Sequence, residues 1–444
     1  MDKVEKKMRN LPVKLVIIYI LATFFISVVG PMKYIGYKYW NVALFLALVL
    51  AAFGLGYYGA HKRKIVWQTS SSSHFSGIRY EKYNRSCLMR QFVQAAILIA
   101  LLVCILEFLQ LYRMNPGLLH IGNIGSNYAN SRASFDDAGY SITTLLRFVT
   151  AFFRNISIIL GLYYFKKFDL IYKCIWICFM GLLVFNNVIG YGTQKIMGDI
   201  IVYAVVIAAI KMLDKSAKYR RRIILLCMAG VLAGVVLFTI MQAERAASIG
   251  LTAANFSSRS DGLAYYDTDN IIFKILGDKL GYGFSALITS YLSSGYYGLS
   301  LCLQLPFIWC FGVGNSYALS VFANRFLGWE NMYYQSYLYR MEETFGRNGL
   351  RSWNTIFPWL ASDLTFPGVI ILFLFVGYIW SVAWDEILKY RNPISIVLFA
   401  NISLGLIFVP ANNQLFSGID ACMTTPFVII MWLVCHKRFN RKVS

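Results

Sequence analysis

The sequence predicts an all-α membrane protein, a polytopic bundle of transmembrane helices. The first observation is composition: of 444 residues, 58% are hydrophobic and only 14% are charged, whereas soluble domains are nearer a quarter charged. The second is the mean hydropathy of +0.56. The third is that apolar runs of about 20 residues, long enough to cross a bilayer core of roughly 30 Å, recur along the whole chain.

These runs predict about ten spans and divide the chain into three parts. Residues 1–241 form an N-terminal bundle of about seven spans, 242–365 one large extracytoplasmic loop, and 366–444 the last spans and a cytoplasmic tail. The predicted spans are 11–30, 41–60, 92–111, 145–164, 171–189, 196–213, 223–241, 366–384, 394–409 and 418–435.

Two segments need separate interpretation. The first span is too long for a cleavable signal peptide, and no small-residue cleavage site follows it. Within the large loop, residues 284–321 are semi-apolar but interrupted by serine, glycine and proline. This pattern favours interfacial or re-entrant helices; if the segment crosses the membrane twice, the span count is twelve.

Basic residues predict the orientation. They gather in the N-terminal tail, in the loops after the second, fourth and sixth spans, and in the C-terminal tail, which all fall on one side if the spans alternate. By the positive-inside rule, both termini are cytoplasmic. The net charge of +21 reflects this topology. Because the cations are spread over separate segments without a compact basic domain, no nucleic-acid partner is expected.

The sequence contains no strong motif for a metal or cofactor site. The nine cysteines are scattered without a paired CxxC, and of the four histidines only His120 is predicted to lie outside. Asp267 and Asp269 form a DxD pattern that holds a metal in many glycosyltransferases, but two aspartates in a polar loop are common. We therefore expect no metal and no cofactor.

Arginines are the distinctive charged residues. Arg147 and Arg154 are seven residues apart, so they share one face of the fourth span, where a charge costs several kcal/mol unless it is partnered. Glu107 and Asp199 are the expected partners. The pair is either a structural ion-pair site or a ladder leading to a lipid-linked phosphate, with Lys195 at the outer mouth.

The large loop adds further arginines and many aromatic residues. Six of its eight cations are arginine, whose planar fork suits phosphate oxygens. Near its end, "RNGLRSWNTIFPWLASDLTFPG" places Arg347 and Arg351 before Asp363. Its tyrosines and tryptophans predict either an aromatic belt at the membrane surface or stacking platforms for sugar rings.

Three short stretches and the layout resemble one family. The stretches are "GYGTQK" (190–195), where many members have Gly-Ser-Arg, then "YLSSGYYGLSLCLQ" (291–304) and "WNTIFPWLASDLTFPGVI" (353–370). Together with the late external loop, they are similar to the Wzy-type O-antigen polymerases, which are related to the O-antigen ligases. The layout of most of the chain resembles that of the family. At the level of individual residues, the resemblance is confined to these three stretches.

The resemblance implies a glycosyltransferase of the bacterial inner membrane. It would polymerise oligosaccharide repeat units linked to undecaprenyl diphosphate into surface polysaccharide (O-antigen of lipopolysaccharide, capsule or exopolysaccharide), releasing the lipid diphosphate at the outer face. Its partners would be the lipid-linked glycan and membrane lipid, and the family also admits a polysaccharide chain-length regulator.

This chemistry needs cations for the leaving diphosphate and a base for the acceptor hydroxyl. We expect catalysis from Arg347, Arg351, Glu343 and Asp363, and diphosphate binding from Arg147, Arg154, Lys195, Arg245 and Arg259. Glu342 and His120 are alternative bases. Glu343 and Asp363 are favoured only because they neighbour the two arginines along the chain.

Other functions remain open from the sequence alone. An O-antigen ligase shares layout and substrate, but ligases usually carry a histidine in the large loop, and residues 242–365 contain none. A lipid-linked oligosaccharide flippase would have two similar halves and short loops, which this chain lacks. A scaffold without catalysis would not need arginines inside the membrane.

Overall fold

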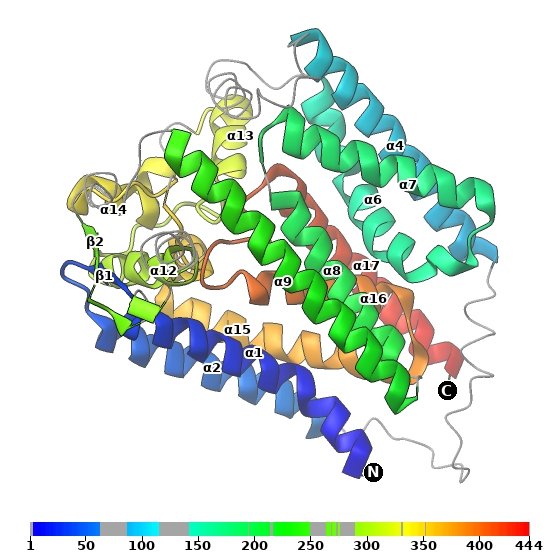
Figure 1. Ribbon diagram of the computed structural model, residues 1–444, viewed down its shortest axis with the longest axis horizontal. Helices are drawn as coiled ribbons and strands as arrows, with labels where there is room; N and C mark the ends of the chain where they lie inside the picture. Colours follow the sequence, from blue (N-terminus) through cyan, green and yellow to red (C-terminus); the bar gives the residue numbers. More distant parts are fainter. Residues whose placement is uncertain are drawn as a thin grey trace. The chain divides into compact units, whose positions relative to one another are not determined.

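The computed structural model describes residues 3–62, 87–114, 142–193, 195–213, 216–248, 263–267, 269–271, 274–275, 289–329, 332–350 and 352–443. Helices dominate this part of the chain (Figure 1). Six described helices are long and apolar enough to cross a membrane, and shorter apolar helices cover Pro393–Ile407 and Asp420–Cys435. The prediction of a multi-pass helical membrane protein is confirmed at this level.

Each of the ten predicted spans falls on a helix, and within the described residues six helices meet the length and hydropathy of a spanning helix. Helix α8 (Lys195–Met212) carries Asp199 and two lysines, and α16 (Pro393–Ile407) has 15 residues, a length of about 22 Å. Two further predicted spans lie on α9 (Ala217–Ser248) and α17 (Ile419–Val443).

The chain forms two compact units, each built from separate stretches of sequence. Unit 1 comprises residues 1–64, 226–382 and 405–418, and unit 2 comprises 65–225, 383–404 and 419–444.

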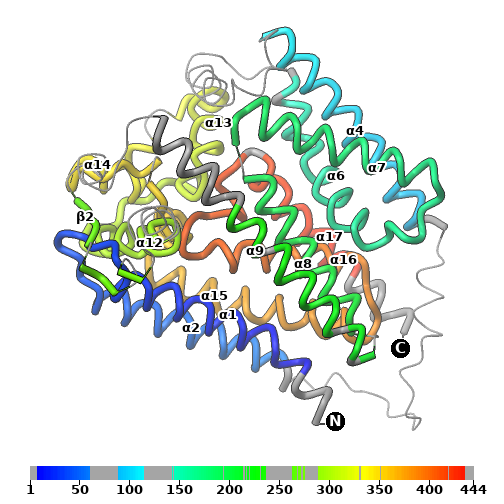
Figure 2. Tube along the Cα trace, viewed as in Figure 1, coloured from blue at the N-terminus to red at the C-terminus, as the bar shows by residue number. Residues whose placement is uncertain are grey.

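Unit 1 contains the N-terminal helices and most of the predicted large loop. Its described elements are α1 (Lys3–Val29), β1 (Met32–Tyr34), α2 (Tyr39–Lys62), β2 (Ala264–Tyr266), α12 (Thr289–Cys302), α13 (Tyr317–Leu327), η6 (Tyr333–Gln335), α14 (Tyr337–Phe345), most of α9, and α15 (Ile356–Tyr390) as far as Val382. The trace in Figure 2 follows α1, α2 and α15 running alongside one another. Trp380 of α15 fixes this packing, because its ring lies 5.8 Å from that of Phe53 and 5.7 Å from that of Tyr57.

A small antiparallel sheet ties the start of the chain to the large loop. Met32 of β1 is opposite Tyr266 of β2, and Tyr34 is opposite Ala264. Nearby, the hydroxyls of Thr23 on α1 and Tyr296 on α12 lie 2.8 Å apart. Helix α12 of the loop therefore packs against α1.

Local sequence signals explain the helix ends in the loop. Ser316 and Ser336 cap the first turns of α13 and α14 by accepting from backbone N–H groups three residues later. Gly328 and Gly346 end the same helices in the left-handed conformation that glycine adopts without steric cost. Helices α13 and α14 therefore give this part of the predicted loop a regular structure.

Helix α15 is broken at the predicted end of the loop. Thr365 has φ 65° and ψ 162°, and its hydroxyl accepts from the backbone N–H of Gly368 at 3.2 Å. Thr365 therefore caps a second helical segment, in which Pro367 occupies an early position where its missing N–H costs nothing. The part before the break, from Ile356, is largely buried, and the long apolar part follows it.

Unit 2 is a bundle around α6. Its described elements are α4 (Cys87–Met114), α6 (Ile142–Tyr164), the 3-10 turn η3 (Phe165–Lys167), α7 (Leu170–Phe185), the π-helical turn η4 (Asn186–Gly190), α8, the start of α9, the end of α15, α16 as far as Leu404, and α17. Helices α4, α8 and α17 all pack on α6. Asn155 of α6, Tyr203 of α8 and Asn401 of α16 form a polar cluster, in which the two asparagines exchange hydrogen bonds of 2.9 and 2.8 Å.

Candidate functional site

Four charged side chains meet inside unit 2. Arg147 and Arg154 come from α6, Glu107 from α4, and Asp420 from the first turn of α17. Each guanidinium group contacts both carboxylates, so the four side chains close a ring, which we call the arginine cluster. Its formal charges cancel.

The contacts of the arginine cluster are short. Arg147 donates to Asp420 from two nitrogens. Its Nε lies 3.1 Å from each carboxylate oxygen, and its Nη2 lies 2.7 Å from Oδ2. Its Nη1 lies 3.1 Å from Oε1 of Glu107. Arg154 donates from Nη2 to Oδ1 of Asp420 at 2.5 Å, and its Nη1 lies 3.5 Å from Oε2 of Glu107. The contacts to Asp420 are charge-assisted hydrogen bonds, the stronger kind in proteins. The contacts to Glu107 are ion pairs without hydrogen-bond geometry.

The two carboxylates differ in exposure. The side chain of Glu107 is 2% exposed, whereas that of Asp420 is 36% exposed. Arg154 is buried with Glu107. A buried charge is tolerated only when it is closely paired, so Glu107 is the fixed counter-ion of the cluster. Asp420 forms its open side.

The sequence identified three of the four members of this cluster: Arg147, Arg154 and Glu107. Glu107 was an expected partner of the arginines, and the ion pairs confirm it. Asp199, the other expected partner, makes no ion pair within the described residues, and its Oδ1 is buried there without a hydrogen-bond partner. Asp420 was missed. The signal for it was available, because a carboxylate inside an apolar segment is rare and calls for a partner.

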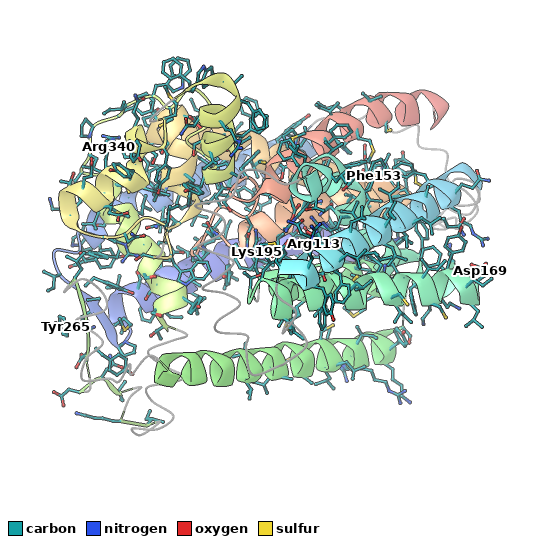
Figure 3. All side chains as sticks on the ribbon, turned by 90° about the horizontal axis from the view of Figure 1, so that it is seen from above. Arg113, Phe153, Asp169, Lys195, Tyr265 and Arg340 are labelled. Carbon is teal, nitrogen blue, oxygen red and sulfur yellow. The ribbon has the colours of Figure 1, made fainter. Side chains whose placement is uncertain are left out.

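The stretch "GYGTQK" (190–195), the first of the three family-like stretches named above, borders the arginine cluster. It follows the π-helical turn η4, and π-turns are often found at functional sites. The Arg147 guanidinium lies over the ring of Tyr191, 5.6 Å from its centroid. The backbone N–H of Thr193 donates to the carbonyl of Asn187 at 2.8 Å. Lys195, labelled in Figure 3, then opens α8 with an exposed side chain.

In unit 1, Arg347 lies at the junction where the other two family-like stretches, residues 291–304 and 353–370, meet. Its Nη2 donates to the carbonyl of Ser294 at 2.9 Å and to that of Trp353 at 2.8 Å. The guanidinium also lies over the ring of Tyr297, 5.2 Å from the centroid. The residue is 7% exposed. One buried cation thus joins α12 to the start of the 353–370 stretch.

Two glycines let these stretches approach closely. A Cβ at Gly295 would lie 1.9 Å from the carbonyl oxygen of Pro410 and 3.0 Å from the backbone nitrogen of Thr355. A Cβ at Gly298 would lie 2.1 Å from Oδ1 of Asn354. A side chain at Gly295 would force the backbones apart, and one at Gly298 would displace the buried side chain of Asn354. The motif glycines are therefore packing residues of the junction.

Tyrosines complete the junction without offering a base. The rings of Tyr34 and Tyr297 stack with centroids 4.8 Å apart, and the Tyr34 hydroxyl lies 2.9 Å from that of Ser293. Burial raises the pKa of Tyr34 to about 12, although the Ser293 hydrogen bond and the Arg347 charge oppose the shift. The Tyr34 hydroxyl therefore stays protonated at physiological pH.

Asp363 is held by a ring of amide donors. Its Oδ1 accepts from the backbone N–H groups of Gly312 at 2.9 Å and Gly314 at 3.2 Å. Its Oδ2 accepts from the backbone of Asn315 at 2.8 Å and from the side chain of that residue at 2.9 Å. These four donors stabilise the carboxylate as an anchor for the loop before α13, a structural task that competes with the predicted role as a base.

The anchored loop displays an aromatic pair. Phe311 directly precedes Gly312, has φ 52°, a strained value for a bulky residue, and stacks on Trp309 with centroids 4.5 Å apart. Both side chains are about half exposed, at 51% and 52%. Asp363 therefore holds a loop that presents aromatic surface to the surroundings.

We predict that Asp363→Ala loosens this loop. Loss of four hydrogen bonds to a charged acceptor should lower the free energy of unfolding by about 2–3 kcal/mol. Thermal unfolding in detergent and protease cleavage within residues 305–316 measure the effect. Asp269→Ala is the matched control, because that side chain is 92% exposed and contacts Lys274 at 3.6 Å. Equal stability of the two variants contradicts the anchoring role.

The neighbouring acids Glu342 and Glu343 differ in exposure, although both have partners, which for Glu343 is the hydroxyl of Tyr339. Glu342 accepts from the Asn348 side chain at 2.7 Å and from the backbone N–H of Gly349 at 3.3 Å. Glu343, the neighbouring base candidate, is exposed. Of these two acids, Glu343 has the solvent access that a general base needs.

Several predicted site residues lie outside the described part. They are Arg351, Arg259, His120 and the side chain of Arg245. The DxD pair is described: Oδ1 of Asp267 accepts from the backbone N–H of Asp269 at 3.1 Å, which makes a local turn. Within the described ranges, no three His, Cys, Asp or Glu side chains gather as metal ligands would.

Comparison with known proteins adds no relative: no family model, no curated protein and no solved structure matches this chain.

Proposed function

We propose that the protein is a membrane glycosyltransferase that polymerises lipid-diphosphate-linked oligosaccharide repeat units. The observation that carries the proposal is the junction at Arg347. Two family-like stretches, about fifty residues apart, meet there through a buried guanidinium and two glycines that admit close packing. Such a junction supports a built site in the large loop rather than a passive connection.

The proposed reaction uses no nucleotide sugar, because the donor glycan carries its own diphosphate leaving group. The acceptor hydroxyl attacks the anomeric carbon of the donor, and the bond from that carbon to the diphosphate oxygen breaks. The electron pair leaves with the lipid diphosphate, and the hydroxyl proton passes to a carboxylate, for which we propose Glu343. Arg347 and Arg351 stabilise the leaving group, and Arg147, Arg154, Lys195, Arg245 and Arg259 hold diphosphate.

We further propose a location in the bacterial inner membrane. If all ten apolar helices cross it, both termini and the basic connections are cytoplasmic. The segment 242–365 then faces outward, where the lipid-linked units are joined. Its exposed Trp309–Phe311 pair provides the kind of aromatic surface on which sugar rings stack.

The proposal is tested by deleting the gene in its native host and separating the surface polysaccharide on a gel. A polymerase predicts a single-repeat band in the deletion strain and a ladder restored by the returned gene. Repeat units trapped on the cytoplasmic side would identify a flippase instead. A ladder that forms on the lipid carrier without reaching its final acceptor would identify a ligase.

A further inference from the structure

The arginine cluster is asymmetric in a way that the proposed diphosphate binding does not explain. Glu107 extends from α4 and is almost completely buried, whereas Asp420 stands in the first turn of α17 with its side chain 36% exposed. Yet Asp420 receives the shortest contacts, 2.5 and 2.7 Å. The more accessible carboxylate therefore contacts three of the five arginine nitrogens that face the two carboxylates.

Asp420 accepts from the nitrogens of Arg147 and Arg154 as a phosphate group would. An arginine fork binds carboxylate and phosphate with the same paired N–H geometry. Arg147 presents Nε and Nη2 to the two oxygens of Asp420, and Arg154 adds a third nitrogen. Three nitrogens from two arginines, directed to one partly exposed anion, make a site whose chemistry matches a phosphate or diphosphate group.

The surrounding charges favour exchange of the anion. Lys195 attracts Asp420, and the buried carboxylate of Asp199 repels it. Without Asp420, the three cations Arg147, Arg154 and Lys195 outnumber the two remaining carboxylates. An incoming anion would therefore meet a net positive site, in which Asp199 repels it as it repels Asp420.

We infer that Asp420 is an exchangeable counter-ion: a phosphate- or diphosphate-bearing ligand replaces its carboxylate between Arg147 and Arg154, and the first turn of α17 is released. Glu107 stays in place and keeps the arginines positioned. The inference rests on the proposed function only for its natural ligand, a lipid-linked diphosphate. The exchange itself is a property of the arginine cluster.

The test measures diphosphate binding by the purified full-length protein in detergent. Inorganic diphosphate is titrated into wild type and Asp420→Asn by calorimetry at fixed ionic strength, with a polyprenyl diphosphate in mixed micelles as a second arm. If the Asp420 carboxylate fills the site for nine-tenths of the time, its removal tightens binding about tenfold. Asp169→Asn, an exposed carboxylate 4.0 Å from Arg90, is the control and should bind as wild type does.

The outcomes separate the inference from the proposed function. Tighter binding of both ligands supports exchange at a diphosphate site, and tighter binding of the lipid alone supports it for a lipid-borne group. Weaker or equal binding in Asp420→Asn, or no binding by either protein, overturns the inference while leaving the polysaccharide ladder to decide the reaction. If diphosphate binding tightens tenfold in Asp420→Asn but the deletion strain still makes the wild-type ladder, the exchange is supported and the polymerase proposal is wrong.

A second measurement does not depend on the variant folding. Hydrogen exchange of the wild-type protein is followed with and without inorganic diphosphate, with sulfate-free chloride buffer at equal ionic strength as the reference. Release of Asp420 predicts faster exchange in the first turn of α17, residues 419–423, and unchanged exchange around Glu107. Slower or unchanged exchange in that turn contradicts the inference.

Discussion

Arg347→Ala should reduce the surface polysaccharide from a ladder to single repeats, which is the largest effect that we expect from one substitution. The change removes a buried cation and leaves the carbonyls of Ser294 and Trp353 without this donor. Each buried carbonyl that loses its partner costs about 1–3 kcal/mol. Arg347→Lys keeps the charge but cannot reproduce the planar fork, so we expect a shortened ladder from it.

Arg340 provides a matched control for Arg347. Arg340, labelled in Figure 3, belongs to the same loop. It donates to the carbonyls of Gln335 at 2.9 Å and Pro306 at 2.7 Å, and its guanidinium lies over the ring of Tyr337. Its chemistry is therefore similar, but it does not join the two family-like stretches. Arg340→Ala should retain the ladder at equal protein level in the membrane. If both alanine variants lost the ladder to the same degree, the effect would reflect folding of the loop.

The helices of this protein are largely predictable from its sequence. Ten apolar runs predict ten helical segments, because hydropathy over about 20 residues is a local property that needs no knowledge of the fold. Thr365 and Pro367 are residue types typical of a helix start, but the positive φ of Thr365 is not a local preference of a β-branched residue. What hydropathy does not decide is whether the polar α8 or the short α16 crosses the membrane.

The partners of the charged residues are much less predictable. Arg154 and Glu107 lie on neighbouring spans, and their pairing follows from the cost of a lone charge in the membrane. Asp420 is 266 positions from Arg154 in the chain, so only the tertiary fold brings them together. Proximity along the chain is equally limited as a guide: it grouped Asp363 with Arg347, yet Asp363 bonds to residues 312–315.

The candidate site also contains features that sequence patterns rarely reveal. The π-helical turn at Asn186–Gly190 has no composition signal, because it depends on one extra residue fitting between packed helices. The role of Gly295 is similarly hidden until Pro410 is known to pack against it. Both features depend on contacts between distant segments, and such contacts are a property of the fold.

Glu107→Gln should cost the protein about 3–5 kcal/mol of stability, because it leaves the buried Arg154 with only part of its counter-charge. The thermal midpoint of the purified protein in detergent measures this loss. Asp169→Asn removes an exposed carboxylate that lies 4.0 Å from Arg90, so it should change stability by less than about 1 kcal/mol. The comparison separates the burial of Glu107 from the general effect of removing an acid.

A double variant decides whether the loss arises from the uncompensated charge. In Glu107→Gln/Arg154→Met, the buried anion and the buried cation are removed together, so most of the lost stability should return. Arg147 and Asp420 would then keep their own pair, with contacts down to 2.7 Å. Stability that recovers while the polysaccharide ladder stays absent would assign Arg154 a role beyond neutralising Glu107. A double variant no more stable than Glu107→Gln would contradict the charge argument, because the cavity or the packing around α4 would then carry the effect.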